Sequence, residues 1–134
     1  MLELKDKLKD LELNKEEHIL NNSIKVDEIL KAVKSLKNGK SAGADCISNE
    51  MIKNGIPVLL EPLCKLFNFI FQKGTFPKIW NESYISLIHK KGDKLNPNNY
   101  RGISITSNLG KLFNKIIHNR LFQFIESNRI QTKI

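Results

Sequence analysis

Two runs of strand-forming residues lie on either side of one basic loop, and this pair limits the sheet that the chain can build. Residues 84–88 and 100–106 are rich in Ile and Tyr and alternate in polarity. Between them, Gly92 with Asp93 and Asn96 with Pro97 are turn signals. The other apolar residues recur mostly at helical spacing. The sequence therefore predicts an α+β fold, with helices packed around a small antiparallel strand pair.

Apolar periodicity predicts the helices. One spans residues 26–36 and ends at Asn38 and Gly39, which favour a left-handed stop. Residues 49–53 form a helical turn that ends at Gly55, and Pro57 then begins a new helix that reaches residue 71. This helix is apolar nearly all round, so we expect it to be buried. The last helix presents one apolar face, which comprises Leu109, Leu112, Phe113, Ile116, Ile117, Leu121, Phe124 and Ile125.

The chain divides near residue 22. Residues 1–22 are charged, and Leu4, Leu8 and Leu11 fall on one helical face. We expect a charged helix and then a linker over 1–22. Residues 23–134 are of a size for one domain or a piece of one.

The charge balance favours a polyanionic partner. Twenty-two Lys and Arg against 14 Asp and Glu give a net charge of +8, and Lys and Arg displace counterions from phosphates. From residue 94 onward the only acid is Glu126, among the basic residues Lys94, Arg101, Lys111, Lys115, Arg120, Arg129 and Lys133. A basic but uncommitted surface is the alternative interpretation.

Cysteine use and hydropathy indicate the compartment. Cys46 and Cys64 have no CxxC spacing, so we expect reduced thiols in an intracellular protein of the nucleus or cytoplasm. No apolar stretch approaches the length that crosses a bilayer, so no membrane partner is expected.

Common catalytic and metal-binding motifs are absent from the sequence. The segment Gly39-Lys40-Ser41 lacks the earlier glycine of a phosphate-binding P-loop, since residue 34 is Lys34, and a helix rather than a strand precedes it. The residues His18, His89 and His118 do not lie at metal-ligand spacing, and we predict no metal site in this chain. No nucleophile elbow is present.

The basic loop is the strongest candidate site. Lys90, Lys91 and Arg101 lie at the adjacent ends of the two predicted strands. An ammonium and a planar guanidinium together suit a triphosphate or a nucleic-acid backbone. A solvated basic hairpin explains the same residues without any ligand, and charge alone does not decide between the two.

An ordered set of motifs resembles one family. The segments that carry the resemblance are Val26-Asp27-Glu28-Ile29 through Leu36-Lys37-Asn38-Gly39-Lys40-Ser41-Ala42-Gly43-Ala44-Asp45-Cys46-Ile47, Glu50-Met51-Ile52-Lys53, Leu66-Phe67-Asn68, Gly74-Thr75-Phe76-Pro77 with Trp80, Ile85 to Asp93, Asn98-Asn99-Tyr100-Arg101-Gly102-Ile103-Ser104, and Gly110-Lys111-Leu112 to Arg120-Leu121. In this order they resemble the reverse transcriptases of non-LTR (LINE-type) retrotransposons. The chain departs from the family where Ala42, Ala44 and Gly102 replace Pro and where Cys46 replaces a Gly that matters if its φ is positive.

The resemblance implies an incomplete right-hand polymerase, the fingers and the start of the palm, over residues 23–134. It implies that Lys90 and Arg101 contact the triphosphate of a deoxynucleotide (dNTP), with Lys91 as a second basic position, and that RNA template and DNA primer are partners. Asp45 is expected to cap the turn that follows it. The family's complete domain uses Mg²⁺ on aspartates that lie downstream of the matched segment. This chain has no Asp-Asp pair, so we expect no cofactor and no polymerase activity from it alone.

Three interpretations therefore stand. The chain is an N-terminal fragment of an RNA-directed DNA polymerase, a stand-alone nucleic-acid-binding module, or an inert remnant of a degraded element. Steeply salt-dependent binding favours the second. Exposed apolar surface, with self-association through the last helix, favours the third.

Overall fold

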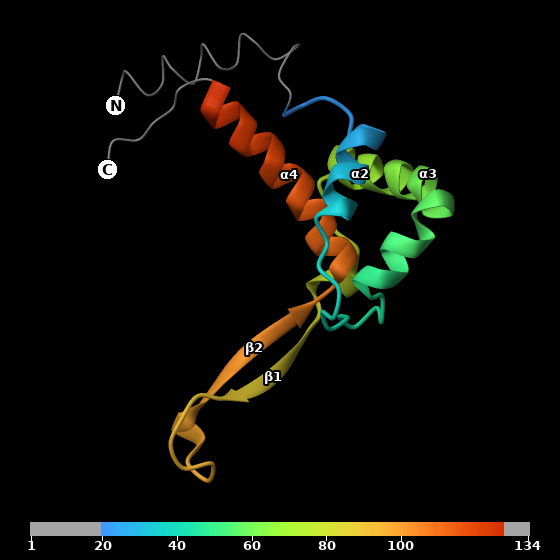
Figure 1. Ribbon diagram of the computed structural model, residues 1–134. Helices are drawn as coiled ribbons and strands as arrows, with labels where there is room; N and C mark the ends of the chain where they lie inside the picture. Colours follow the sequence, from blue (N-terminus) through green and yellow to red (C-terminus); the bar gives the residue numbers. More distant parts are fainter. Residues whose placement is uncertain (1–19, 128–134) are drawn as a thin grey trace, which may run out of the picture.

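Residues 20–127 are described by a computed structural model, in which a helical body carries a projecting β-hairpin (Figure 1). The elements run α2 (Val26–Lys34), α3 (Asn49–Lys73), the 3₁₀ turn η1 (Lys78–Asn81), β1 (Ser83–His89), η2 (Pro97–Asn99), β2 (Tyr100–Thr106) and α4 (Asn108–Ser127). The α+β class and the antiparallel strand pair are confirmed. The helix expected around Leu4, Leu8 and Leu11 lies outside the described residues, and the division near residue 22 stays a prediction. No helix within residues 20–127 is long and apolar enough to cross a membrane.

The first predicted helix is confirmed as α2, and two motif residues fix the loop that follows it. Gly39 has the left-handed φ of +68° that was expected, but it is not the helix stop: α2 ends at Lys34, its cap Ser35 is right-handed with φ −80°, and Gly39 lies in the loop. Its N–H donates to the Glu50 carboxylate at 2.6 Å. One turn along α3, the Lys53 ammonium donates to the Asn38 side chain at 2.8 Å. Glu50 and Lys53, which are part of the family resemblance, therefore act here by holding the α2–α3 loop.

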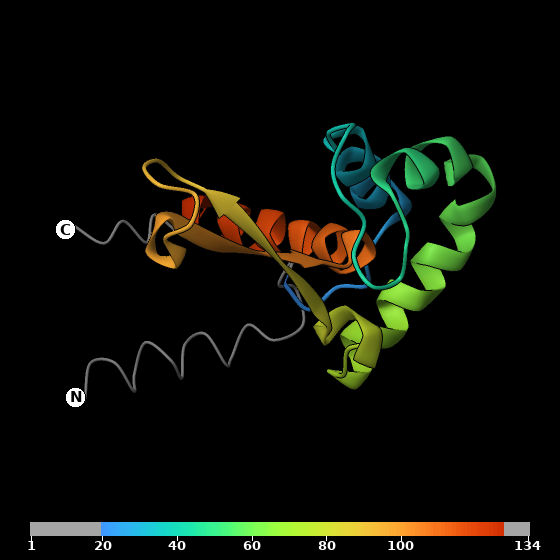
Figure 2. The same ribbon diagram turned by 90° about the horizontal axis from the view of Figure 1, so that it is seen from below.

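The predicted break at Gly55 is wrong, because α3 is one continuous helix. The Ser48 hydroxyl caps its start by accepting from the Met51 N–H, and Gly74 ends it with φ +68°. Pro57 and Pro62 both lie inside the helix, where each removes one backbone hydrogen bond. The helix bends instead of ending: its first turns and its C-terminal half point in different directions (Figures 1 and 2).

The expectation that this helix is buried all round is also wrong. Val58 and Phe69 are 81% and 57% exposed, whereas Leu63, Phe67 and Ile70 are buried. Only one face of the C-terminal half of α3 therefore reaches the core. The bend explains why: a helix that changes direction cannot keep all of its sides against the same neighbours.

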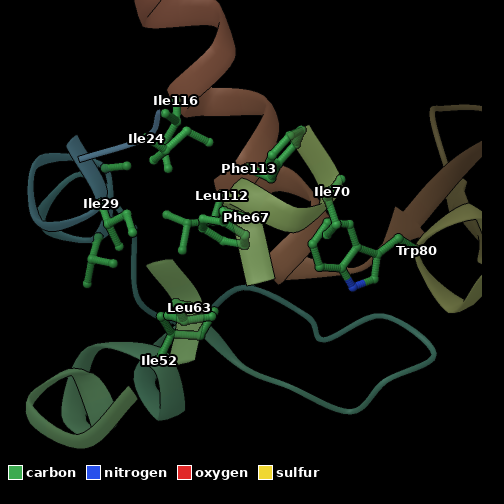
Figure 3. Packing of buried hydrophobic residues seen from close by; sticks show 12 residues of the cluster. Ile24, Ile29, Ile52, Leu63, Phe67, Ile70, Trp80, Leu112, Phe113 and Ile116 are labelled. Carbon is green, nitrogen blue, oxygen red and sulfur yellow. The ribbon is translucent and has the colours of Figure 1, made fainter. Parts of the chain in front are cut away.

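The core is an aromatic and aliphatic cluster where α2, α3 and α4 meet. Figure 3 shows Phe67 inside this cluster, with Leu112 and Phe113 of α4 beside it. Phe67 makes edge-to-face contacts with Phe113 and Trp80, at centroid distances of 5.5 and 6.3 Å, which stabilise aromatic pairs beyond their buried area. The buried hydrophobic residues are Ile24, Ile29, Ala32, Val33, Ile52, Leu63, Phe67, Ile70, Trp80, Leu112, Phe113 and Ile116.

The last helix forms as predicted, but its buried face differs from the expected one. Leu112, Phe113 and Ile116 are buried, whereas Leu121 and Ile125 are 46% and 39% exposed. Arg120 takes the inward position one turn after Ile116 and is only 3% exposed. The apolar pattern alone could not show this, because a buried arginine interrupts the stripe.

Candidate nucleic-acid interface

The register of the hairpin places two of the three predicted basic residues on one face. Ile88 pairs with Arg101 and His89 with Tyr100. The Lys90 N–H donates to the Asn99 carbonyl at 2.7 Å, so the ladder continues by one residue beyond β1. Side chains alternate between faces along a strand, and Lys90 therefore shares the face of Ile88 and Arg101. Diagonal neighbours of this kind lie about 7–8 Å apart.

Lys91 lies beyond this last ladder bond, in the bend at the tip of the hairpin. The structure thus brings Lys90 and Arg101 together by strand register, and Lys91 only by proximity in sequence. All three side chains are exposed. Within residues 20–127, none of the three forms an ion pair with an acid.

Polar side chains organise the loop between the strands. Asp93 accepts the Leu95 N–H at 2.9 Å, and the Asn99 amide donates to the Asp93 carbonyl at 2.8 Å. Gly92 has φ +86°, and a Cβ there would lie 2.8 Å from the Asn99 side-chain nitrogen. The Asp93 carboxylate is therefore used within the loop rather than against the neighbouring lysines, which stay available for an anion.

The root of the hairpin is locked to the loop that follows α2. Asp45 accepts the Ile47 N–H at 3.2 Å, which confirms its predicted role as a turn cap. Its other oxygen accepts the Ser107 hydroxyl at 2.5 Å, and the Ser107 hydroxyl in turn accepts the Gly110 N–H at the start of α4. This chain of hydrogen bonds joins the loop, the end of β2 and α4.

Two further features of this loop depend on backbone conformation. A Cβ on Gly43 would lie 2.5 Å from the Ser107 backbone nitrogen, so the close approach requires glycine. Cys46 has φ +55°, which is the conformation that the glycine of the family pattern adopts without strain. The departure at Cys46 therefore falls where the chain needs a left-handed residue.

A cleft of about 570 Å³ lies between this loop and the face of the hairpin that carries Arg101. Ile88 and Ile103 line its apolar side, and Lys40 and Lys111 bring positive charge to it. Isoleucines from the hairpin and lysines from two other segments thus surround one hollow. The cleft was not predicted, because Lys40 and Lys111 are 71 residues apart in the sequence.

Arg120, assigned from the sequence to the basic C-terminal third, does not belong to this surface. It forms a bidentate pair with Glu28, at 2.6 and 2.8 Å. It also donates to the carbonyls of Asn22 and Ser23 and lies 5.5 Å from the Phe71 ring centroid. The hydrogen bond from Arg120 lowers the pKa of the Glu28 carboxyl below its ordinary value. We call this group of contacts the Arg120 clamp.

Within residues 20–127, no three His, Cys, Asp or Glu side chains lie together as metal ligands would. Cys46 and Cys64 are free thiols.

Comparison with known proteins adds sequence relatives. No protein-family model matches the chain. It is 39% identical over 109 residues to the probable RNA-directed DNA polymerase from transposon BS of Drosophila melanogaster, which is 80% of this chain and 12% of that protein. It is 31% identical over 101 residues to the RNA-directed DNA polymerase from mobile element jockey of the same organism, 75% of this chain and 11% of that protein. The chain thus spans only about an eighth of the length of these curated relatives.

Proposed function

The chain belongs by sequence to the RNA-directed DNA polymerases of non-LTR retrotransposons, and on this basis we propose that it supplies nucleotide and template contacts within such a polymerase. In this proposal, residues 23–134 correspond to the fingers and the start of the palm. The hairpin tip contacts the triphosphate of a dNTP and the phosphates of an RNA template or DNA primer. Membership of the family rests on the relatives, and the role of each residue is our inference.

One observation carries the proposal: Lys90 and Arg101 share a face at the end of a projecting arm. Neither has an acidic partner within residues 20–127, so the approach of a phosphate need not break an existing ion pair. A guanidinium can bind two phosphate oxygens at once, whereas an ammonium acts as a point charge. Arg101 should therefore fix the orientation of a phosphate, and Lys90 should add attraction.

The polymerase reaction itself needs groups that we do not assign to this chain. A divalent metal is implied for the complete family domain, where it would activate the primer hydroxyl and stabilise the leaving pyrophosphate. The residues described here offer no cluster of carboxylates that would hold it. In this proposal, the described residues bind phosphate and position a strand.

The test is a salt titration of single-stranded RNA binding by the whole chain. Arg101→Ala, and the double change Lys90→Ala with Lys91→Ala, should weaken binding and should each lower the salt slope by about 0.7 for every phosphate that the variant no longer binds. The matched control is Lys34→Ala with Lys73→Ala, which removes two exposed lysines from α2 and α3. If the hairpin variants and the control give the parent's affinity and slope, the hairpin is only a solvated surface.

We propose in addition that the hairpin, and the side of α4 that carries the exposed residues Leu121 and Ile125, need an apolar partner. Ile85 and Leu87 on one face of the hairpin are 64% and 68% exposed, and Leu95 in the loop is 91% exposed. Monomeric proteins rarely leave a continuous patch of this kind uncovered. The isolated chain should therefore self-associate or bind a hydrophobic dye, and a dye-silent monomer in light scattering would count against this proposal.

A further inference from the structure

The side of α4 that faces away from the core carries an unusual set of residues. Positions 111, 115, 118 and 122 follow one another at intervals of four, three and four, so they lie in one row along the helix. The core residues Leu112 and Ile116 lie on the other side. We call the outward row the basic–aromatic face; it comprises Lys111, Lys115, His118 and Phe122, all exposed.

Phe122 is the exposed aromatic residue of this row. It is 53% exposed, and its ring stacks on the His118 ring with centroids 6.3 Å apart and planes 30° apart. The two rings therefore form one stacked pair, which we call the Phe122–His118 platform, and about half of the Phe122 surface stays accessible to a ligand. The only acid between Asn108 and Ser127 is Glu126, which lies one turn beyond Phe122 on the same side of the helix, so the positive charge of the row is concentrated at its Lys111–Lys115 end.

We propose that the basic–aromatic face binds a single strand of nucleic acid, with phosphates on Lys111 and Lys115 and a base stacked on the Phe122–His118 platform. Lys111 and Lys115 are one helical turn apart, about 6 Å along the axis, so they can contact successive phosphates of an extended strand. Every nucleobase presents a flat π-face, so this mode of binding does not depend on sequence.

Charge complementarity selects this partner over an apolar protein surface. An apolar partner would bury Lys111 and Lys115 without an acid to pair with, and unpaired buried charge is costly. A nucleic-acid strand instead meets both halves of the row, because its phosphates match the lysines and its bases match the rings. The expected site therefore requires positive charge and an aromatic ring together.

The location of the row supports a continuous path. Lys111, at its first position, lines the cleft of about 570 Å³ with Lys40. It also lines a second cleft of about 280 Å³ with Trp80 and Asn114. A strand on α4 would thus begin at the root of the hairpin, where polar and cationic groups from three segments meet. This surface is separate from Lys90, Lys91 and Arg101 at the hairpin tip.

The first experiment removes the ring. Fluorescently labelled oligouridylate, oligothymidylate and inorganic polyphosphate are titrated with the whole chain and with Phe122→Ala. Loss of one base stack weakens binding by about 5- to 150-fold, so both oligonucleotides should lose at least fivefold and polyphosphate should lose little. The control is Phe69→Ala, which removes an equally exposed phenylalanine (57%) from α3 and should change none of the three.

The second experiment removes the charge. Lys111→Gln with Lys115→Gln should lower the salt slope for oligonucleotide binding by about 1.4, since each phosphate contact on a single strand contributes about 0.7. The control is Lys34→Gln with Lys73→Gln. Circular dichroism of each variant establishes that it is folded before binding is compared.

The third experiment separates this proposal from the one for the hairpin. In Phe122→Trp, the new indole should be quenched by oligonucleotides but not by polyphosphate, after the parent's Trp80 signal is subtracted. The quenching should persist when Arg101→Ala is added, whether or not Arg101→Ala itself changes the binding of RNA. Unchanged oligonucleotide affinity in Phe122→Ala, or equal quenching by polyphosphate, would overturn the assignment of a base-stacking platform.

Discussion

Breaking the Arg120 clamp should destabilise the fold more than any other single loss of charge in the described residues. Arg120 is 3% exposed, while the Glu28 side chain is 27% exposed. Removing one partner of a fully buried pair costs about 3–5 kcal/mol. Water reaches part of Glu28, so we expect Glu28→Gln to cost about 2–3 kcal/mol, somewhat below that range.

Replacing Arg120 with Met keeps the length of the side chain but removes every donor. The carbonyls of Asn22 and Ser23 are then left without their partners, at about 1 kcal/mol each, and Glu28 is left without its counter-charge. We expect a loss of about 3–4 kcal/mol for Arg120→Met, which is a large part of the stability of a domain. The double variant should have about the same free energy of unfolding as Arg120→Met, because the glutamine that replaces Glu28 carries no charge that needs a partner.

The measurement is urea unfolding followed by circular dichroism for the parent, both single variants and the double variant. The losses in free energy of unfolding of the two single variants, added together, should exceed the loss of the double variant by about 2 kcal/mol, which is the coupling energy of the pair. Glu61 and Lys65 form an exposed pair at 2.7 Å and provide the control cycle, in which coupling should not be measurable. Additive losses at Glu28 and Arg120 would show that the clamp is not the source of the stability.

Other features of the fold lead to four more predictions. The pKa of Glu28 is lowered in the folded chain. The contribution of Glu28 to the free energy of unfolding is therefore present above the ordinary pKa of 4.5 and is lost as pH falls through the folded pKa. The free energy of unfolding should therefore fall less steeply with falling pH in Glu28→Gln than in the parent. Cys46→Gly should raise the urea midpoint, because relief of about 1–2 kcal/mol of left-handed strain exceeds an entropy cost of about 0.4–1 kcal/mol. Gly43→Ala, whose Cβ would lie 2.5 Å from the Ser107 nitrogen, should lower the urea midpoint by an amount that corresponds to about 1–3 kcal/mol. The purified chain with Mg²⁺ and a primed template should incorporate no nucleotide above background, because it has no Asp-Asp pair.

Local patterns predicted most of the elements. The strands at 84–88 and 100–106 and the left-handed conformation of Gly39 depend on residues close together in the sequence, and the structure confirms them. Pro57 led to the wrong prediction, because the penalty for a proline is local, whereas the packing of Phe67 on Phe113 of α4 is not. Tertiary contacts kept α3 continuous at the cost of a bend.

Long-range polar contacts could not be predicted. Nothing near Arg120 in the sequence indicates that it pairs with a glutamate 92 residues earlier, so charge counting placed it on the surface. For Asp45 the sequence predicted only the cap to Ile47 and not the bond to Ser107. At the hairpin, by contrast, strand alternation was enough to expect Lys90 near Arg101, because an antiparallel register is itself a local consequence of the turn.

The Arg120 clamp also links the folding of the core to the progress of protein synthesis. At about 5–20 residues per second, a ribosome needs about 5–18 s to pass from codon 28 to codon 120. During that interval α2 exists without α4, and the apolar side chains of Ile29 and Val33 have only part of their final neighbours. A nascent chain that stalls in this window would present an open core to chaperones and proteases, whereas one whose α4 has left the ribosome can close α2 against α4. The clamp therefore makes the closure of this core depend on the synthesis of both helices.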